Sequence, residues 1–325
     1  INVKELAEGV IAGNRVALAK AITLVESTKE EHFELASELI EVCLPHCVES
    51  KRIGITGVPG VGKSTFIEAL GTSLTSSGHK VAVLAVDPSS DLSKGSILGD
   101  KTRMEKLASD SNAFIRPTPS SGTLGGVARK TRETISLCEA AGFDVVLVET
   151  VGVGQSEVAV HSMVDMFLVM VLATAGDELQ GIKRGIMELA DMVVINKDDG
   201  DNANYTKVAK ASYAQALHLF PEKDSGWTVP VQTCSSLENR GISNIWSTVE
   251  SYFFQIVLNG FRDEMRAQQN KYWLRQAIEE ELHHKFFHDP LMEENIKTYE
   301  MAVENGEMSP FKAAKNLLKQ WRYNS

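Results

Sequence analysis

The sequence predicts an α/β protein with a doubly wound, mostly parallel sheet, preceded by N-terminal helices and followed by a C-terminal helical arm. Near-continuous runs of β-branched and other apolar residues alternate with helical segments, which is typical of strands covered on both faces. A Gly-rich turn joins the first run to a helix, as in domains that bind ligands at the carboxyl ends of their strands. After residue 258 Arg, Gln, Glu and Lys dominate, which predicts the arm.

The elements follow in order along the chain. Residues 2–48 are expected to be helical because apolar residues such as Val10, Ala17 and Ala21 recur at helical spacing. Six strands are then expected, at residues 51–56, 80–86, 143–149, 166–172, 192–196 and 228–233. The predicted parts are a helical extension (1–50), a phosphate-loop domain (51–257) and a helical arm (258–325).

One connecting segment is expected to lack regular structure. Residues 116–126 are rich in Gly and Pro. Two interpretations stay open for this segment: a mobile segment near the functional site, or a rigid connector.

The arm has an apolar stripe with a spacing of four residues, formed by Leu274, Ile278, Leu282 and Phe286. Ser309 and Pro310 are typical of an N-cap and first position of a final helix. The stripe must pack on the chain's own domain or on a second copy, and we favour the second copy and therefore a homodimer. His284 and His288 lie one turn apart and could bind a metal, although a solvated helix face is the simpler interpretation.

The overall composition limits the classes of binding partner and the cellular location that we expect. The net charge of −10 argues against nucleic acid or an anionic membrane as the main partner, and no apolar run is long enough to span a bilayer. The first residues lack the features of a secretory signal, so we expect a cytoplasmic protein, or a mitochondrial matrix protein only if a transit peptide preceded residue 1. The four cysteines suit a reduced compartment; Cys43 and Cys47 could form a metal pair, but buried thiols are favoured.

A phosphate-binding loop is the most specific motif. It fits the pattern G-x-x-x-x-G-K-[ST], between a predicted strand and a predicted helix. Lys63 is expected to reach the β- and γ-phosphates of a nucleotide, and the Ser64 hydroxyl to bind Mg²⁺. The nucleotide is expected to contact the residues Gly57, Val58, Pro59, Gly60, Val61, Gly62, Lys63, Ser64 and Thr65.

A second loop predicts which base is bound. Asn196, Lys197 and Asp199 fit N-K-x-D at the end of a buried strand. The Asp199 carboxylate can accept from guanine N1–H and from its 2-amino group, whereas adenine offers neither donor. The residues Ser235, Ser236 and Leu237 resemble the loop whose backbone contacts the guanine oxygen. GTP is therefore favoured over ATP.

Carboxylates follow the other predicted strands. Asp87 ends the second strand, Asp100 lies in the segment after it, and Glu149 ends the third strand before Gly152. Carboxylates at these positions beside a phosphate loop suit Mg²⁺ binding or the orientation of water. Asp87 could otherwise be a helix cap or turn residue, but we favour the magnesium role.

Four longer motifs together resemble the MeaB/ArgK-type G proteins: residues 86–90 (VDPSS), 95–104 (GSILGDKTRM), 149–157 (ETVGVGQSE) and 176–183 (GDELQGIK). The resemblance covers nearly the whole chain. It implies a P-loop GTPase of the SIMIBI class that acts as a chaperone for adenosylcobalamin-dependent acyl-CoA mutases, chiefly methylmalonyl-CoA mutase. It also implies slow basal hydrolysis that the partner stimulates.

The resemblance also implies roles for particular residues. Ser64, Asp87, Asp100 and Glu149 would surround Mg²⁺ and the γ-phosphate. The residues 177–183 would form a mobile segment that couples the nucleotide state to the mutase, and Lys183 would neutralise phosphate charge. No cobalamin site is identifiable in the sequence.

Three other functions agree less well with these motifs. A kinase or ATPase linked to the transport of basic amino acids disagrees with the N-K-x-D loop. A metallochaperone GTPase for another metalloenzyme would usually have His-rich or Cys-His motifs, and this chain has only scattered ones. A scaffold that binds GTP without turnover would not need the set of carboxylates.

Overall fold

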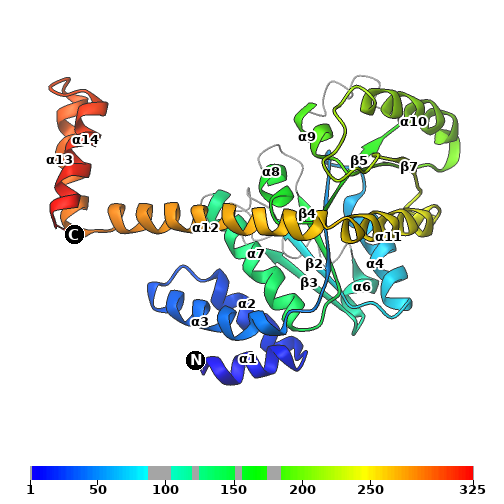
Figure 1. The fold of residues 1–325 in the computed structure, drawn as a ribbon, viewed down its shortest axis with the longest axis horizontal. Coiled ribbons are helices and arrows are strands. Elements are labelled where there is room, and N and C mark those ends of the chain that lie inside the picture. Colours follow the sequence, from blue (N-terminus) through cyan, green and yellow to red (C-terminus); the bar gives the residue numbers. More distant parts are fainter. Residues whose placement is uncertain (1, 87–103, 119–123, 151–155, 174–183, 325) are drawn as a thin grey trace. The chain divides into compact units, whose positions relative to one another are not determined.

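The structure is a computed structural model that describes residues 2–86, 104–118, 124–150, 156–173 and 184–324 (Figure 1). The chain divides into two compact units, Ile1–Gln269 and Asn270–Ser325. The first unit carries the sheet and the predicted nucleotide site. All the described secondary structure of the second unit is α-helical.

The first unit contains a seven-stranded sheet in the order β3-β2-β4-β1-β5-β6-β7. All the strand pairs are parallel. The strands are β1 (Lys51–Gly57), β2 (Val81–Val86), β3 (Ala113–Thr118), β4 (Val145–Thr150), β5 (Met166–Leu172), β6 (Met192–Asn196) and β7 (Val231–Thr233). The doubly wound α/β fold predicted from the sequence is confirmed.

One strand was missed by the sequence analysis. β3 includes Arg116, Pro117 and Thr118, and helix α7 begins at Leu124, so the expectation that residues 116–126 lack regular structure was wrong at both ends. Residues 119–123 lie outside the described part of the chain. β3 is an edge strand, and proline is tolerated at an edge because its missing N–H removes no hydrogen bond within the sheet. The apolar residues Phe114 and Ile115 were the available indication of this strand.

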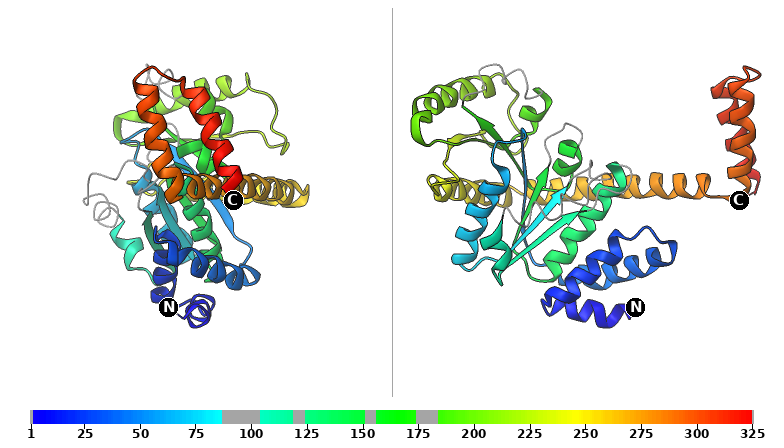
Figure 2. Two further views of the ribbon diagram at one scale, coloured as in Figure 1. Left: turned by 90° about the vertical axis from the view of Figure 1, so that its left-hand side faces the viewer. Right: turned by 180° about the vertical axis from the view of Figure 1, so that it is seen from behind.

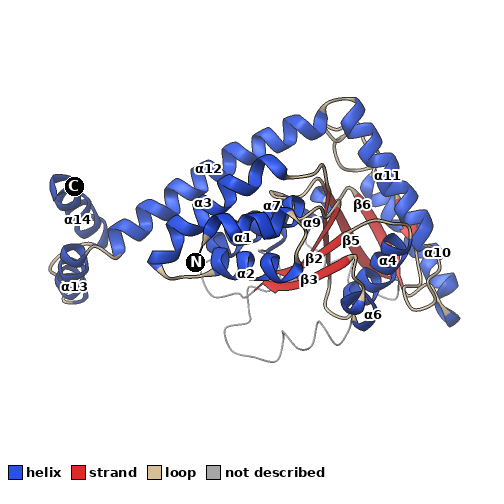
Figure 3. Cartoon of the chain, turned by 90° about the horizontal axis from the view of Figure 1, so that it is seen from below, coloured by secondary structure: helices blue, strands red, loops and turns tan. Residues whose placement is uncertain are grey.

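Helices cover both faces of the sheet, as Figure 3 shows. The described helices of the first unit are α1 (Val3–Ile11), α2 (Arg15–Glu26), α3 (Phe33–Cys43), α4 (Lys63–Ser76), α6 (Glu105–Ser109), α7 (Leu124–Ala140), α8 (Ser156–His161), α9 (Arg184–Leu189), α10 (Ala203–Leu217), α11 (Ile242–Leu258) and the first turns of α12 (Phe261–Phe287). α1, α2 and α3 pack on one another and on α7. The helical nature of residues 2–48 is therefore confirmed.

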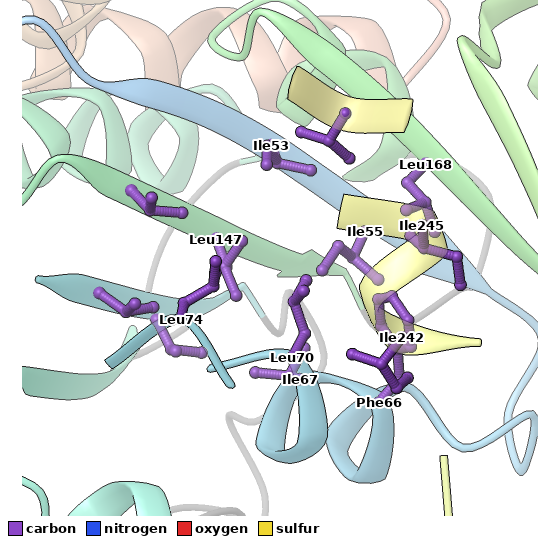
Figure 4. Close-up of a cluster of buried hydrophobic side chains, with 14 of the residues drawn as sticks. Ile53, Ile55, Phe66, Ile67, Leu70, Leu74, Leu147, Leu168, Ile242 and Ile245 are labelled. Atoms are coloured by element: carbon purple, nitrogen blue, oxygen red, sulfur yellow. The ribbon is translucent and has the colours of Figure 1, made fainter. Parts of the chain in front are cut away.

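The two faces of β1 meet different helices. Ile53 and Ile55 are fully buried in a hydrophobic cluster with side chains of α4 and α11. Figure 4 shows this cluster, including Phe66 of α4 and Ile245 of α11. Gly54 lies on the opposite face, because successive residues of a strand alternate between faces. A Cβ atom on Gly54 would lie only 2.8 Å from the Phe167 ring and 3.0 Å from Val160 of α8. The glycine therefore lets α8 and β5 approach the strand that leads into the phosphate loop.

The start of α12 is tied to the base of the sheet by a buried ion pair. Arg266 donates from Nε and Nη2 to the two carboxylate oxygens of Asp165, both at 2.7 Å, and also to the Ser50 carbonyl at 2.8 Å. The Asp165 side chain is fully buried and also accepts from the Arg52 amide. A second buried pair, Arg52–Glu139, lies beside it. α12 thus begins as part of the first unit.

The second unit contains the rest of α12, α13 (Pro290–Glu304) and α14 (Pro310–Asn324). α13 and α14 lie side by side, as Figure 2 shows. The predicted cap is confirmed, because the Ser309 hydroxyl accepts from the Lys312 amide at 3.3 Å and its carbonyl from the Ala313 amide at 3.0 Å. Asp289 caps α13 in the same way. None of the described helices in the whole chain combines the length and the apolar character that crossing a bilayer requires.

Candidate functional site

The phosphate loop connects β1 to α4 with a backbone that needs glycine. Gly57 has φ +155°, and a Cβ atom there would lie 2.5 Å from the Met170 carbonyl oxygen of β5. Gly62 has φ +96°, and its Cβ would lie 2.6 Å from Nδ2 of Asn196. Side chains at either position would push the loop off its two neighbours. The loop is therefore shaped by β5 and by the end of β6, two segments more than 100 residues away in the sequence.

Lys63 lies at the start of α4 and is largely buried. Its Nζ donates to the Gly57 carbonyl at 2.8 Å and to the Val58 carbonyl at 3.5 Å. Burial lowers the pKa of Lys63, and the nearby carboxylates of Glu149 and Glu157 oppose this change. The ammonium group thus lies under the loop that would hold the phosphates of a nucleotide.

Ser64 and Glu149 come together from different elements. The Ser64 hydroxyl of α4 donates to Oε1 of Glu149, at the end of β4, at 3.2 Å. A hydroxyl and a carboxylate so close are oxygen ligands of the kind that Mg²⁺ prefers, so these residues fit the ion that a nucleoside triphosphate brings. Asp87 and Asp100, the other two carboxylates predicted for this site, lie outside the described residues, as does Lys183.

Asn196 joins the phosphate loop to the loop after β7. Its Nδ2 donates to the Val61 carbonyl at 2.9 Å. Its Oδ1 accepts from the Ser236 amide at 3.1 Å, from the Ser236 hydroxyl at 2.8 Å and from the Cys234 thiol at 3.4 Å. Asn196 is almost fully buried. Its amide therefore fixes the relative position of the two loops.

Lys197 and Asp199 complete the second loop. Lys197 adopts φ +61°, and its Nζ donates to the Gly60 carbonyl of the phosphate loop at 2.8 Å. The Ser235 hydroxyl donates to Oδ2 of Asp199 at 2.6 Å. Ser235 thus orients the carboxylate and leaves the remaining lone pairs for donors on a base.

The structure brings the described members of the predicted nucleotide site into two adjoining loops. Pro59 and Gly60 are exposed at the tip of the phosphate loop, Val61 is buried beneath it, and Thr65 is exposed on α4. Leu237 is 80% exposed, so its apolar side chain is available to pack on a ligand.

Some supporting residues were missed by the sequence analysis. The Thr206 hydroxyl donates to Oδ1 of Asp198 at 2.5 Å, and the guanidinium of Arg240 donates to the Asp198 carbonyl. The Ser235 and Arg240 backbones form a two-way bridge, with both N–H···O distances at 3.0 Å. No local pattern marks Thr206 or Arg240, because their partners lie 8 and 42 residues away.

The alternative metal sites gain no support from the described residues. No group of three or more His, Cys, Asp or Glu side chains among them could hold a metal ion. Burial raises the pKa values of Cys43 and Cys47 to about 11, which disfavours the thiolate form that binds metals. The His284 and His288 rings stack 4.3 Å apart, and His288 Nδ1 donates to the His284 carbonyl.

Comparison with known proteins connects this site to a family. Residues 18–290 match the sequence model of the methylmalonyl-CoA mutase-associated GTPase MeaB. A probable GTPase of Mycobacterium tuberculosis is 50% identical over 314 residues, which cover 97% of this chain and 94% of that protein. The GTPase ArgK of Escherichia coli is 49% identical, with 95% of each chain covered. The mitochondrial methylmalonic aciduria type A homolog of Mus musculus is 46% identical, over 98% of this chain and 80% of the relative.

A solved structure supports the same assignment. The crystal structure of a LAO/AO transport system kinase is 41% identical in sequence and covers 99% of each chain, with a TM-score of 0.76. The geometry of the described residues of the predicted nucleotide site and the similarity over nearly the full length agree with each other. The chain belongs to the MeaB family of methylmalonyl-CoA mutase-associated GTPases, and its enzymatic activity is the hydrolysis of GTP.

Proposed function

We propose that this GTPase is a chaperone of an adenosylcobalamin-dependent acyl-CoA mutase, with methylmalonyl-CoA mutase as the first candidate. The match of residues 18–290 to a family of mutase-associated GTPases carries the proposal. The mouse relative, named for methylmalonic aciduria, supports it. In this proposal GTP binding and hydrolysis gate the loading, protection and reactivation of the mutase cofactor, in the cytoplasm.

The described residues suit this nucleotide chemistry. The amides of the loop from Gly57 to Ser64 would surround the phosphates, and Lys63 would exchange its contact with the Gly57 carbonyl for the β- and γ-phosphates. Mg²⁺, when bound, would neutralise charge on the phosphates. Ser64 and Glu149 would hold it, together with Asp87 and Asp100.

The second loop would hold guanine. Asp199 would accept from the base, and Asn196, Lys197, Ser235, Ser236 and Leu237 would shape the pocket around it. The hydrogen bond from Ser235 to Asp199 and the contacts of Asn196 support this assignment, because they give both side chains a fixed orientation before a nucleotide arrives.

The first experiment measures GTP turnover by the purified protein with and without a cobalamin-dependent acyl-CoA mutase from the same source. Strong stimulation by the mutase is the expected result, since a switch that a partner activates has slow turnover alone. Turnover of GTP with no response to the mutase would reject the proposed partner while leaving the GTPase activity in place.

The same experiment tests a rival function, suggested by the solved relative that is described as a transport system kinase. ATP replaces GTP in a parallel reaction, with basic amino acids present in one arm. Turnover that requires ATP would favour the kinase. Turnover restricted to GTP rejects it.

We also propose a role for Lys183 in the hydrolysis that the mutase stimulates. It lies outside the described residues, and only the family resemblance supports its role beside the phosphates. We expect Lys183→Ala to lose the mutase-stimulated hydrolysis and to keep the basal hydrolysis. Equal loss of both rates would contradict a role that depends on the partner.

Homodimerisation through the arm is the last part of the proposal. Three residues of the apolar stripe remain about half exposed in the described chain: Leu274, Ile278 and Leu282. A groove of about 740 Å³, lined largely by apolar side chains of α12, α13 and α14, lies in the same unit. Exposed apolar side chains that gather on one helix beside an apolar groove are typical of an interface.

The dimer is tested in the full chain by the double variant Ile278→Glu, Leu282→Glu. Two buried charges would disfavour association, so light scattering is expected to give the mass of a monomer. Gln276→Glu, which adds a charge at a polar position of the same helix, is the control and should remain dimeric. A dimer that persists in the double variant would reject this interface.

A further inference from the structure

Two threonines lie at the ends of neighbouring strands directly under the phosphate loop. Thr56 precedes the first glycine of the loop in β1, and Thr150 is the last residue of β4. Each has only 1% of its surface exposed. The Thr150 hydroxyl donates to Oγ1 of Thr56 at 2.7 Å. This buried hydroxyl pair has no part in the phosphate-loop or base motifs.

The pair lies where the regular contact between β1 and β4 stops. The paired register of these strands ends at Ile55 and Glu149. The hydroxyl pair is the next contact along the two strands. On its other side Thr150 is paired in register with Val86 of β2. Thr150 is therefore held by both of its neighbouring strands.

Alternation along β4 directs its last two residues to opposite faces of the sheet. Glu149 lies on the face of α4, where it accepts from the Ser64 hydroxyl at 3.2 Å. Thr150 lies on the other face, with Thr56 and with Gly54, which contacts α8 closely. The end of β4 is thus fastened on one face by Glu149 and on the other by Thr150.

Packing alone does not require hydroxyl groups at these positions. Among the described residues, the neighbours on this face, Val148, Val160 and Val169, are apolar and buried. Valine has nearly the shape of threonine, and a pair of valines would fill the same space without desolvating two hydroxyls. A polar pair in these surroundings indicates a need for a directional contact.

We propose that Thr150 is a positioning residue for GTP hydrolysis. Its hydrogen bond to Thr56 fixes the end of β4 against the strand that enters the phosphate loop, and so holds the Glu149 carboxylate at the Ser64 hydroxyl. The group it positions is the one that would bind the Mg²⁺ of the substrate, so the inference rests on the proposed role of Glu149. A small displacement of such a group lowers the rate of the chemical step more than the affinity for the nucleotide.

The test compares variants of the full-length protein by three measurements: the single-turnover rate of GTP hydrolysis, the affinity for GDP and the melting temperature. Thr150→Val is expected to lower the rate about tenfold while GDP affinity is kept. Thr150→Ser retains the hydroxyl, so its rate of GTP hydrolysis should be close to that of the parent protein. Thr134→Val is the control, because Thr134 is fully buried in α7 and its hydroxyl donates to the Lys130 carbonyl of the same helix, away from β1 and β4.

The double variant Thr56→Val, Thr150→Val separates positioning from stability. Replacing both partners leaves no unpaired hydroxyl, so the melting temperature should return towards that of the parent. The hydrolysis rate should stay low, because the directional contact is still absent. A rate that follows the melting temperature through all the variants, or a Thr150→Val variant with the parent rate, would overturn the inference.

Glu149→Gln distinguishes this inference from the proposal on which it rests. If Glu149→Gln hydrolyses GTP at the parent rate, the role of Glu149 and the role of Thr150 both fail. If Glu149→Gln is slow and Thr150→Val is not, only the role of Thr150 fails. If both variants are slow and Thr150→Ser hydrolyses GTP at nearly the parent rate, the positioning role is supported.

Discussion

Replacing Asp199 by Asn is a direct test of the base site. The Asp199 carboxylate accepts from the Ser235 hydroxyl at 2.6 Å, which fixes its orientation. Its remaining lone pairs are those that would accept from guanine N1–H and the 2-amino group. An Asn side chain keeps one carbonyl oxygen but presents an NH₂ group where the second acceptor was.

The magnitude follows from the hydrogen bonds at stake. A hydrogen bond to a charged group contributes about 1.5–3 kcal/mol, and the two with guanine together about 3–6 kcal/mol. Because the Asn oxygen retains a weakened form of one of them, we expect a loss near the lower end, which is about 100-fold in affinity for GTP. Xanthosine triphosphate should bind better than before, since the Asn amide can donate to its 2-oxo group.

Fluorescence titration with labelled GTP, xanthosine triphosphate and ATP measures this change. Asp198→Asn is the matched control, because Asp198 accepts from Thr206 at 2.5 Å and its Asn replacement can still accept. The control should keep the preference for GTP. Parent affinity for GTP in Asp199→Asn, or an equal loss in both variants, would refute the assignment of Asp199 to guanine.

Three further predictions concern stability and loop geometry. Arg266→Leu removes the bidentate partner of a fully buried carboxylate and should lower the free energy of unfolding by about 3–5 kcal/mol in urea titrations; a loss below about 1 kcal/mol would contradict this. Burial, with a smaller effect of a nearby lysine, lowers the pKa of His161 to about 4. The unfolded chain, with an ordinary value near 6.5, therefore binds a proton first as the pH falls. Stability should decrease between pH 6.5 and 4 by up to about 3 kcal/mol, and His161→Gln should flatten this part of the pH profile. Gly62→Ala should weaken GTP and GDP binding at least about tenfold, because its Cβ would displace Asn196, whereas Gly78→Ala, at a similar φ with no neighbour within 4 Å, should not.

The sequence predicted well what depends on local pattern. The six strands recognised as apolar runs need only short stretches of chain, and so does the Ser309 cap. β3 was missed because Pro117 normally argues against a strand, and only the sheet order shows that it lies at an edge.

Contacts between distant segments could not be predicted. Asn196 bonds Val61, 135 residues away, and Thr150 bonds Thr56 across 94 residues. Arg266 and Asp165 are 101 residues apart. These contacts depend on strand order and on which face each side chain occupies, and a strand order cannot be derived from the periodicity of single strands.

The strand order also affects how the protein is made. β1 lies between β4 and β5, so residues 51–57 have no neighbouring strand until residues 145–150 have left the ribosome, and no second one until residues 166–172 have followed. The segment predicted to form the base site, around residues 196–240, comes later still. Pairing between such distant segments is slow because a long loop must be closed before any contact forms. An unfinished chain that ends before residue 145 therefore carries the complete phosphate-loop sequence but neither of the strands between which β1 lies in the sheet.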